Sequence, residues 1–518
     1  KRNDAKFYSQ RHIKLQLGDI HQIIKQNALK FGQHFVCKTY DGAKEEQPSW
    51  IQPNEKVCNH HFKKIMHQGY TVQFHHPQHF HGNIARLIGL LESYFGVEVG
   101  CNVYITPSKK QGLAPHWDDV EVFVLQIEGK KHWKLYQRTE DENKYPLQSS
   151  NDLDLANDCP DAQLLFECDL EPGDLLYFPR GTIHCAQTVG DSHSTHITIS
   201  THQRATWGDF IHTLMEKAMD DAIEQHTELR QNMPINFISY MGSTFEENAD
   251  DDMKQKQQAF TEKLQRIVSD LVVQSVGNVV HSTCDVVAAD FVSHRLPPAF
   301  MLNQQKKKNV NEEKQEIEFT ESTKVCLKCV DWIRVVNDDE FDNEQKSEVE
   351  EDDEEEEDGE EDFEEDEDND LEYGSSEYVY KDKKTGVGIK MIDLPPKGED
   401  KQQGQEDKVA TFMDDDEDEE DDETAEEEQG EFRLYTCINN DVNTHCVEFT
   451  DDAKGDNGKY VKLPMFLRPV VDRLIHAFPE FITLKELVDR CKEETPVTLP
   501  EIEVFLKLLL DMQLISKQ

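Results

Sequence analysis

The stretch "GLAPHWDDVEVFVLQIEGKKHWKLY", residues 112–136, places a histidine and an aspartate two residues apart at the start of an otherwise apolar run. In a β-strand, the side chains at positions i and i+2 point to the same side of the sheet. His116 and Asp118 are therefore expected to converge on one point, with Trp117 turned away. An imidazole nitrogen and a carboxylate oxygen directed at one point indicate a metal site, which requires a third ligand.

The third ligand is expected in "LEPGDLLYFPRGTIHCAQT", where a turn, a buried strand and a second turn lead to His184, 68 residues after His116. Two histidines and one carboxylate form the facial triad that binds Fe(II) and leaves one octahedral face open. Zinc could occupy the same ligands, and His116 could instead be an ordinary surface histidine. We favour iron because a two-electron oxidant needs the open positions.

Residues 1–205 combine short β-type runs with turns rich in Gly, Pro and Asp, which predicts a sandwich or barrel with one helix within residues 80–96. The runs are "YTVQFHHP", "CNVYITP", "VEVFVLQIEG", "KHWKLY", "GDLLYFP" and "THITIST".

From Trp207 the apolar period changes to that of a helix, and a second amphipathic helix follows within residues 260–276. These helices could complete the core of the barrel or pair with a second subunit. The first carries two neighbouring apolar rows, Phe210, Leu214, Ala218 and Ala222 beside Ile211, Met215, Met219 and Ile223, and the second carries Leu264, Ile267 and Leu271.

The net charge of −50 is concentrated in two blocks, with 18 acids in residues 350–370 and 13 acids in residues 414–428. Dense like charge with few apolar residues cannot form a core, so we expect residues 337–430 to be disordered. Such a tract keeps a chain in solution, and it could also attract basic partners, including histones. No apolar run reaches the roughly 18 residues of a membrane span. The chain begins at Lys1 rather than at a methionine, and we expect a preceding segment.

Residues 431–518 read as a strand followed by three helices, which fits a small winged-helix module. Thr498 and Glu501 have the spacing of a capping box at the start of the last helix. Acids outnumber bases by 15 to 11 in this segment, so it lacks the basic footprint that binding to phosphates needs. We therefore expect a protein-contact module, without direct binding to DNA.

Three segments resemble the JmjC-domain ribosomal oxygenases: residues 100–136, "GDLLYFPRGTIHCAQT" and "HSTHITIST". "DDVEVF" and "KHWKLY" are more similar to the ribosomal oxygenase 2 type than to its nucleolar paralogue, and "ADFVSHRLPP" resembles the family's segment before its C-terminal module. The resemblance implies a mixed α/β (α+β) chain. Its parts would be a JmjC/cupin-like double-stranded β-helix (1–205), a helical dimerisation domain (206–298), a winged-helix module (299–336 and 431–518) and the disordered acidic insert (337–430).

The same resemblance implies roles for individual residues. It assigns His116, Asp118 and His184 to Fe(II), and Lys131 and Asn102 to the co-substrate 2-oxoglutarate, with Lys131 holding the distal carboxylate and Lys130 acting as a turn charge. It assigns Tyr104, Ser200 and Gln73 to the substrate side, where the alternative is a barrel interior with a few satisfied polar groups.

The implied activity is hydroxylation of the β-carbon of a histidine in a large-subunit ribosomal protein, by a homodimer in the nucleus and nucleolus. Two alternatives stay open. A JmjC enzyme could demethylate histone lysines, although the sequence shows no clear aromatic cage. A non-catalytic acidic scaffold for basic proteins would have no reason to keep the triad and Lys131 together.

Overall fold

In the computed structural model the chain forms two compact units: Lys1–Glu312 with Cys437–Gly455, and Glu313–Thr436 with Asp456–Gln518. The structure describes residues 4–137, 145–245, 249–298, 301, 318–337, 378–381, 388–391, 430–438, 440–446, 460–492, 495 and 497–518.

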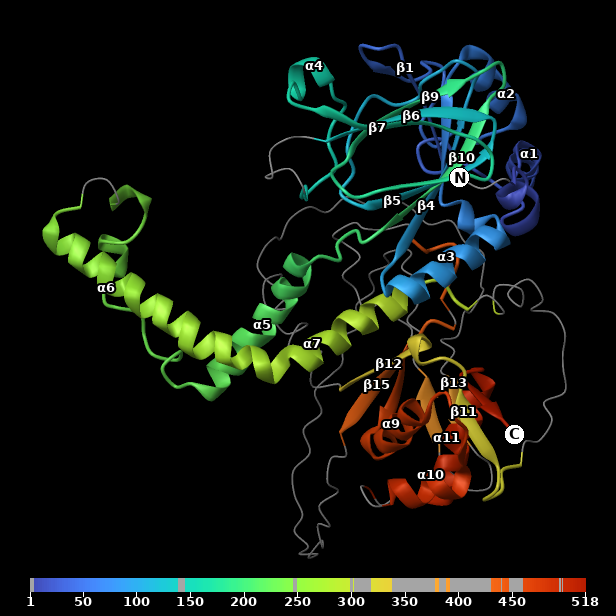
Figure 1. The fold of residues 1–518 in the computed structure, drawn as a ribbon. Coiled ribbons are helices and arrows are strands. Elements are labelled where there is room, and N and C mark those ends of the chain that lie inside the picture. Colours follow the sequence, from blue (N-terminus) through green and yellow to red (C-terminus); the bar gives the residue numbers. More distant parts are fainter. Residues whose placement is uncertain are drawn as a thin grey trace, which may run out of the picture. The chain divides into compact units, whose positions relative to one another are not determined.

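Two antiparallel sheets form the β-rich part of the first unit (Figure 1). Their strands are β1 (Phe35–Tyr40), β2 (Glu45–Glu46), β3 (Thr71–His75), β4 (Val99–Thr106), β5 (Glu121–Glu128), β6 (Lys130–Gln137), β7 (Gln163–Leu170), β8 (Leu175–Phe178), β9 (Ile183–Val189) and β10 (Ser194–Thr201). The larger sheet has the order β2-β1-β3-β4-β10-β5-β8, and the smaller one has the order β7-β6-β9. All six β-type runs expected from the sequence are strands of these sheets, which confirms a β-rich, cupin-like domain.

The two central strands of the larger sheet separate apolar from polar side chains by strict alternation. In β4, Cys101 and Val103 are buried in an apolar cluster, and Asn102 and Tyr104 lie on the opposite face. In β10, Ile197 belongs to the same apolar cluster. The antiparallel register then places Thr198 opposite Asn102 and His196 opposite Tyr104. The larger sheet therefore has one apolar face and one face lined by polar groups.

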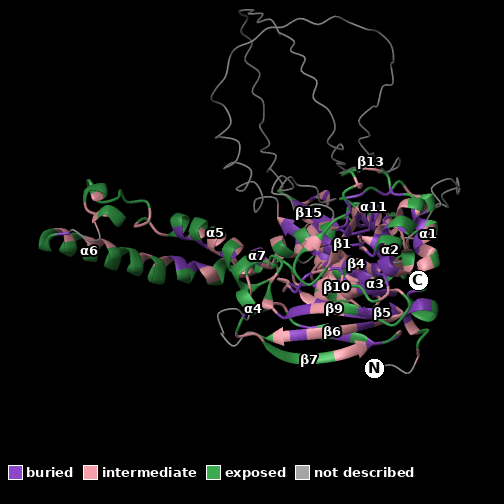
Figure 2. Ribbon diagram, turned by 90° about the horizontal axis from the view of Figure 1, so that it is seen from above, coloured by how far each residue is buried: buried purple, intermediate pink, exposed green. Residues whose placement is uncertain are grey.

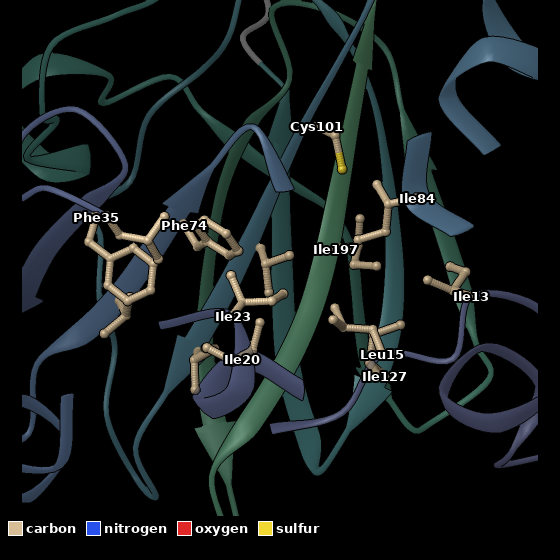
Figure 3. Packing of buried hydrophobic residues seen from close by; sticks show 14 of the residues in the cluster. Ile13, Leu15, Ile20, Ile23, Phe35, Phe74, Ile84, Cys101, Ile127 and Ile197 are labelled. Atoms are coloured by element: carbon tan, nitrogen blue, oxygen red, sulfur yellow. The ribbon is translucent and has the colours of Figure 1, made fainter. Parts of the chain in front are cut away.

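Three helices cover the apolar face: α1 (Leu17–Gln26), α2 (Asn59–Gln68) and α3 (Gly82–Phe95). Figure 3 shows how Ile20 and Ile23 of α1 and Ile84 of α3 pack with Ile197 of the sheet. Each such fully buried side chain contributes about 1.5–3 kcal/mol through removal of apolar surface from water. This cluster is the main core of the unit.

A smaller apolar cluster lies on the polar-lined side, between the two sheets. It joins Val122 and Val124 of β5 to Trp133 of β6 and Phe178 of β8. The ring centroids of Trp133 and Phe178 are 6.1 Å apart. Since this cluster fills only part of the space between the sheets, the remaining positions on β4, β6, β9 and β10 are left to the polar groups described below.

The three helices that follow the barrel are α5 (Trp207–Gln225), α6 (Asp251–Ile267) and α7 (Val273–His294), of which α6 and α7 are joined by a single π-helical turn. Thr206 and Asp209 form a capping box that starts α5. Ala218 and Ala222 are fully buried against Val272, where α5 runs along α7 (Figure 1). Among the described residues, no helix combines the length and the apolar character needed to cross a membrane.

In the part of the second unit that the structure describes there are two small sheets, with the orders β17-β11-β18 and β12-β15-β16-β14-β13, and three α-helices. Its elements are β11 (Lys324–Leu327), β12 (Ile333–Asn337), β13 (Tyr378–Lys381), β14 (Gly388–Met391), β15 (Glu431–Thr436), β16 (Tyr460–Pro464), α9 (Arg468–Ala477), β17 (Ile482–Thr483), α10 (Leu484–Cys491), α11 (Leu499–Asp511) and β18 (Ile515–Lys517). The expected capping box is present, since the Glu501 carboxylate accepts hydrogen bonds from the Thr498 amide (2.7 Å) and hydroxyl (2.6 Å).

The segment expected to be disordered begins and ends at paired strands, since β12 and β15 are antiparallel neighbours with Asn337 opposite Phe432. Within it the structure describes the strands β13 and β14, which were not predicted; β14 joins β16 through the pair Met391 and Val461. The other residues between 338 and 429 lie outside the described part of the chain.

Residues 437–446 follow β15 but belong to the first unit, whereas the sequence analysis assigned them to the C-terminal module. The Asn440 side chain donates to the carbonyls of Val292 (2.9 Å) and Arg295 (2.8 Å) at the end of α7. His445 Nε2 lies 2.6 Å from Glu92 Oε1 of α3, and these two side chains are 1% and 0% exposed. We call residues 437–446 the returning segment.

Burial opposes the charged form of His445, but the neighbouring Cys446 and Glu92 side chains outweigh it and hold the pKa of His445 well above its usual value. Because burial raises the pKa of the Cys446 thiol, Glu92 is the anion that pairs with the imidazolium at neutral pH. The second oxygen of Glu92 accepts from the amide of Leu296 at 2.9 Å. The pair is thus both charged and hydrogen-bonded.

We predict that His445→Ala lowers the free energy of unfolding by about 3–5 kcal/mol, because it leaves a buried carboxylate without its cation. Since the pKa of His445 is raised on folding, this contribution is complete below its usual value near pH 6.5 and is lost as the pH rises through the folded-state pKa. Urea titrations at several pH values measure both effects. Lys109→Ala is the control, because it breaks an equally short but exposed ion pair with Asp191 (2.7 Å) and should leave the midpoint unchanged.

Candidate metal centre

The histidine and aspartate at the start of the quoted stretch lie on the loop before β5, and not within a strand as predicted. An isolated β-bridge pairs the backbone of His116 with that of His184. The His116 amide donates to the His184 carbonyl (3.2 Å), and the His184 amide donates to the His116 carbonyl (2.8 Å). The backbone of the third predicted ligand therefore holds the first one. The convergence that was expected from strand geometry comes from this bridge.

The three predicted ligands come together at one point. One ligand atom from each of His116, Asp118 and His184 lies within 4.8 Å of the other two, and among the described residues this is the one group of three or more possible ligands so arranged. The two imidazole rings are 4.3 Å apart between centroids. His184 Nε2 lies 3.7 Å from Asp118 Oδ2, too far for a hydrogen bond.

Both imidazoles are oriented by backbone carbonyls. His116 Nδ1 lies 2.8 Å from the Ala114 carbonyl oxygen, and His184 Nδ1 lies 3.1 Å from that of Thr182. A carbonyl oxygen only accepts, so each Nδ1 carries the proton and each Nε2 presents its lone pair. Two lone pairs and a carboxylate that face one another repel unless a cation lies between them, so the donor set fits a divalent metal.

The turn before β9 holds the aspartate segment in place. Gly181 has φ +76°, a left-handed conformation that favours glycine, and its amide donates to the Asp118 carbonyl at 2.9 Å. The Arg180 guanidinium donates to the carbonyl of Asp119. "PRGTIH" thus delivers His184 and fixes the backbone of Asp118 at the same time.

Burial, followed by the nearby His116, lowers the pKa of His184 to about 4 against the opposing effect of Asp118. The imidazole is therefore neutral at physiological pH, which is the form that binds metals.

The two adjacent lysines of β6 lie on opposite faces, as predicted. Lys130 is outside, in ion pairs with Asp169 (2.8 Å) and Glu171 (3.5 Å). Lys131 is buried, and its ammonium donates to the Thr106 hydroxyl at 3.2 Å. Burial lowers the pKa of Lys131 to about 7, and among the described residues no carboxylate lies within ion-pair distance of it. A buried ammonium without an anion fits the distal carboxylate of 2-oxoglutarate.

The remaining predicted residues line the polar face of the larger sheet. Asn102 hydrogen-bonds to the His75 imidazole. Gln73 donates to the Tyr104 hydroxyl at 2.9 Å, and burial, followed by the charge of Asp118, raises the pKa of Tyr104. Ser200 lies opposite Gly100, where a Cβ atom would come within 2.5 Å of the Ser200 hydroxyl. Glycine at that position leaves room for the serine.

Sequence reasoning missed four polar residues of this region. Thr106 and Thr188 are buried hydroxyls near Lys131, and His196 stacks on Tyr104 with centroids 4.9 Å apart and planes 3° from parallel. Glu45 accepts from the Ala114 amide at 2.7 Å and so fixes the carbonyl that orients His116. The alternation of "HSTHITIST" was a signal for His196, because it places that residue on the face of Ser200.

The protein-family model of the JmjC domain matches residues 73–208 of this chain, which include all eight predicted site residues. The chain is 35% identical to ribosomal oxygenase 1 of Rattus norvegicus over 286 residues (54% of this chain, 45% of that protein). It is 40% identical to ribosomal oxygenase 2 of Bos taurus over 232 residues (45% and 46%). It is 31% identical to the bifunctional lysine-specific demethylase and histidyl-hydroxylase NO66 of Dictyostelium discoideum over 342 residues (65% and 63%).

These matches define the class: the chain carries a JmjC domain, and the predicted resemblance to ribosomal oxygenases is confirmed. Identity is higher with ribosomal oxygenase 2 than with ribosomal oxygenase 1, over a shorter segment, in line with the predicted preference. The chain spans about half the length of most of these relatives. The JmjC match and the His116–Asp118–His184 cluster together confirm Fe(II) and 2-oxoglutarate as the cofactors.

We predict that Asp118→Ala abolishes metal binding at this centre while the chain stays folded. Asp118 is the anionic member of the cluster, so its loss should weaken affinity well beyond the roughly 10–100-fold typical of changes outside the ligand set. Calorimetric titration with Mn²⁺ measures the affinity. Asp119→Ala is the matched control, because that carboxylate accepts from the Ser149 hydroxyl (2.7 Å) outside the cluster. Equal affinities of the two variants would show that the metal binds elsewhere.

Proposed function

We propose that this chain is an Fe(II)- and 2-oxoglutarate-dependent oxygenase that hydroxylates the β-carbon of a histidine in a large-subunit ribosomal protein. The observation that carries the proposal is the cluster of His116, Asp118 and His184 within 4.8 Å, in which His184 lies on β9, beside the strand β6 that carries the buried Lys131. The relatives named ribosomal oxygenase support the class of substrate.

In this proposal each residue of the chain has a limited task. The triad would hold the metal by three ligands, and Lys131 would hold the distal carboxylate of 2-oxoglutarate, with Asn102 beside it. The metal and 2-oxoglutarate, when bound, supply the oxidising chemistry. The surrounding side chains orient the substrate's C–H bond and keep bulk water from the centre.

The substrate side is formed by Gln73, Tyr104 and Ser200, which all present hydrogen-bonding groups on one face. Such groups suit an imidazole, which both donates and accepts hydrogen bonds. The strongly negative charge of the chain also favours encounter with a basic ribosomal protein.

Demethylation of a histone lysine is the second candidate, because one relative is named a lysine-specific demethylase as well as a histidyl-hydroxylase. A methylammonium group is recognised by the faces of several aromatic rings. Here one face of Tyr104 is covered by His196, and the hydroxyl of Tyr104 is bound by Gln73. This arrangement favours the histidine substrate.

Mass spectrometry distinguishes the two activities. The full chain with Fe(II) and 2-oxoglutarate is incubated with peptides of large-subunit ribosomal proteins and with methylated histone tails. The proposal expects the mass of one oxygen atom on a ribosomal histidine, and no change in the histone peptides. Loss of methyl groups from histone lysines, without histidine oxidation, would contradict it.

We predict that Lys131→Ala raises the KM for 2-oxoglutarate roughly 10- to 150-fold, since a charge-assisted hydrogen bond in a buried site is worth about 1.5–3 kcal/mol. Steady-state succinate production measures this change, and metal affinity should be roughly preserved. Lys130→Ala is the matched control because that ammonium lies outside. A larger effect of Lys130→Ala would reverse the assignment of the two lysines.

We also propose that the chain forms a homodimer through α5, α6 and α7. The row Leu214, Ala218 and Ala222 is buried within the unit, but Ile211, Met219 and Ile223 of the neighbouring row are exposed. On α6, Leu264 is 51% exposed, and Figure 2 shows this helix as largely exposed. A two-fold pairing would bury the same stripe from both chains, and permanent interfaces commonly exceed about 2,000 Å².

The dimer predicts the outcome of light scattering at micromolar concentration. We expect a dimer for the full chain, a dimer for a variant lacking residues 340–430, and monomer or aggregate for Leu264→Glu with Ile267→Glu. The acidic insert should take no part because its like charges repel a second copy. Lys263→Asp on the exposed face of α6 is the matched control. A monomeric full chain would contradict the proposal.

The location of the protein stays a proposal as well. We place it in the nucleus and nucleolus, where ribosomal proteins are assembled into subunits. All twelve cysteines are free thiols, which suits a reducing compartment.

A further inference from the structure

Two of the three metal ligands lie on residues 114–119, which we call the metal loop and which have no regular secondary structure apart from the β-bridge at His116. In an extended chain, successive residues direct their N–H and C=O groups to opposite sides, so a bridge at one residue does not hold the next. The next residue is Trp117, which lies between His116 and Asp118. Whatever holds the backbone of Trp117 therefore also sets the directions of the two ligand side chains.

The backbone of Trp117 is held by residues 148–153, which lie between β6 and β7 and which we call the strap. The Trp117 amide donates to the Ser150 hydroxyl at 3.0 Å, and the Ser150 amide donates to the Trp117 carbonyl at 3.0 Å. This reciprocal pair has the form of a β-bridge in which a serine hydroxyl replaces one carbonyl. The metal loop is thus bonded to β9 at His116 and to the strap at Trp117.

Further hydrogen bonds join the strap to the metal loop on both sides of this pair. They run from the Leu153 amide to the Pro115 carbonyl (2.9 Å), from the Trp117 indole N–H to the Gln148 carbonyl (3.2 Å), from the Asp119 amide to the Ser149 hydroxyl (3.2 Å) and from that hydroxyl to the Asp119 carboxylate (2.7 Å). The bond from the Trp117 amide differs from the backbone bonds because it needs a side-chain acceptor at position 150. A serine hydroxyl is such an acceptor on a short side chain.

We propose that Ser150 is a positioning residue of the metal centre. Its hydroxyl holds the Trp117 amide and so keeps the metal loop extended, with His116 and Asp118 directed to the same side. The inference rests on the proposed function, in which these two side chains bind Fe(II). Ser150 is not a member of the ligand cluster and acts through the directions of the ligands. Groups that orient ligands in this way commonly change metal affinity by roughly 10- to 100-fold.

The adjacent Ser149 provides the matched control, because it has the same chemistry at a different position. Its hydroxyl holds Asp119, which lies beyond the two ligands. The carbonyl of Asp119 also accepts from the Arg180 guanidinium, so this end of the metal loop stays bonded when the Ser149 hydroxyl is removed. Ser149→Ala should therefore bind metal as the parent chain does.

The experiment is a calorimetric titration of the full chain with Mn²⁺, with the electron paramagnetic resonance spectrum of the bound ion as a second readout. We expect Ser150→Ala to weaken Mn²⁺ binding roughly tenfold. At saturating Mn²⁺ its spectrum should be broader than that of the parent, because the ligands adopt a wider range of directions. Ser150→Thr keeps a hydroxyl on Cβ, so it should restore both the affinity and the spectrum.

The melting temperature of the metal-free chain separates positioning from support of the fold. The backbone bonds of the strap, from Ser150 to Trp117 and from Leu153 to Pro115, remain in Ser150→Ala, so we expect this variant to melt close to the parent. A large drop, or a chain that does not fold, would show that the hydroxyl supports the fold and would overturn the positioning role.

The remaining outcomes are equally decisive. Parent-like Mn²⁺ affinity or a parent-like spectrum in Ser150→Ala would overturn the inference. An equal loss of affinity in Ser149→Ala would overturn it as well, and so would a failure of Ser150→Thr to restore binding. A parent chain that binds no Mn²⁺ would instead overturn the proposed function, so the two failures are distinguishable.

Discussion

Side chains on β4 and β10 alternate between two environments, and both environments have to be satisfied by one register. Cys101, Val103 and Ile197 enter the core beneath α1–α3, and Tyr104 and His196 stack on each other on the opposite face. A slip of one residue would exchange these sets and place a phenol and an imidazole against Phe74 and the isoleucines. The size of the apolar core therefore fixes the register, and the register fixes which polar groups reach the metal centre.

The price of this arrangement is a set of buried polar groups that the fold itself does not satisfy. Lys131 and His184 are both desolvated, and burial lowers the pKa of each. A smaller, fully apolar interior between the sheets would have been simpler to stabilise, and the cluster around Val124 and Phe178 shows that part of the space is filled in that way. Three of the unsatisfied positions, on Trp133, Thr188 and His196, lie together around Lys131. Stability given up there becomes available as binding energy for charged ligands.

The sequence was sufficient to predict the triad, the inward Lys131 and the strands that carry the site, because period-two alternation and turn residues are local signals. The conformation at His116 was not predictable, since its β-bridge partner His184 is 68 residues away. Thr188 gave no signal because a buried threonine in a strand looks like any β-branched residue. The packing of the returning segment on the first unit was not predictable for a similar reason: the contact between His445 and Glu92 spans 353 positions, and no sequence pattern near either residue indicates it. Strand β7 was missed because its exposed edge position leaves no alternation, as the run of exposed residues at its start shows.

Two histidine–carboxylate pairs of the first unit, His445 with Glu92 and His184 with Asp118, show how the same chemical groups can form either a structural contact or a ligand site. In the pair of His445 and Glu92 the nitrogen and oxygen are 2.6 Å apart, so a proton lies between them, and an amide satisfies the second oxygen of Glu92. In the pair of His184 and Asp118 the separation is 3.7 Å, and the proton of His184 is directed away, toward the Thr182 carbonyl. The imidazolium of the first pair has no nitrogen lone pair left for an ion. The second presents two acceptors to each other at a distance that a hydrogen bond does not span, and His116 adds a third. The Thr182 carbonyl makes the difference, because it fixes the proton of His184 on Nδ1. His184 Nε2 therefore presents a lone pair to a metal instead of a proton to Asp118.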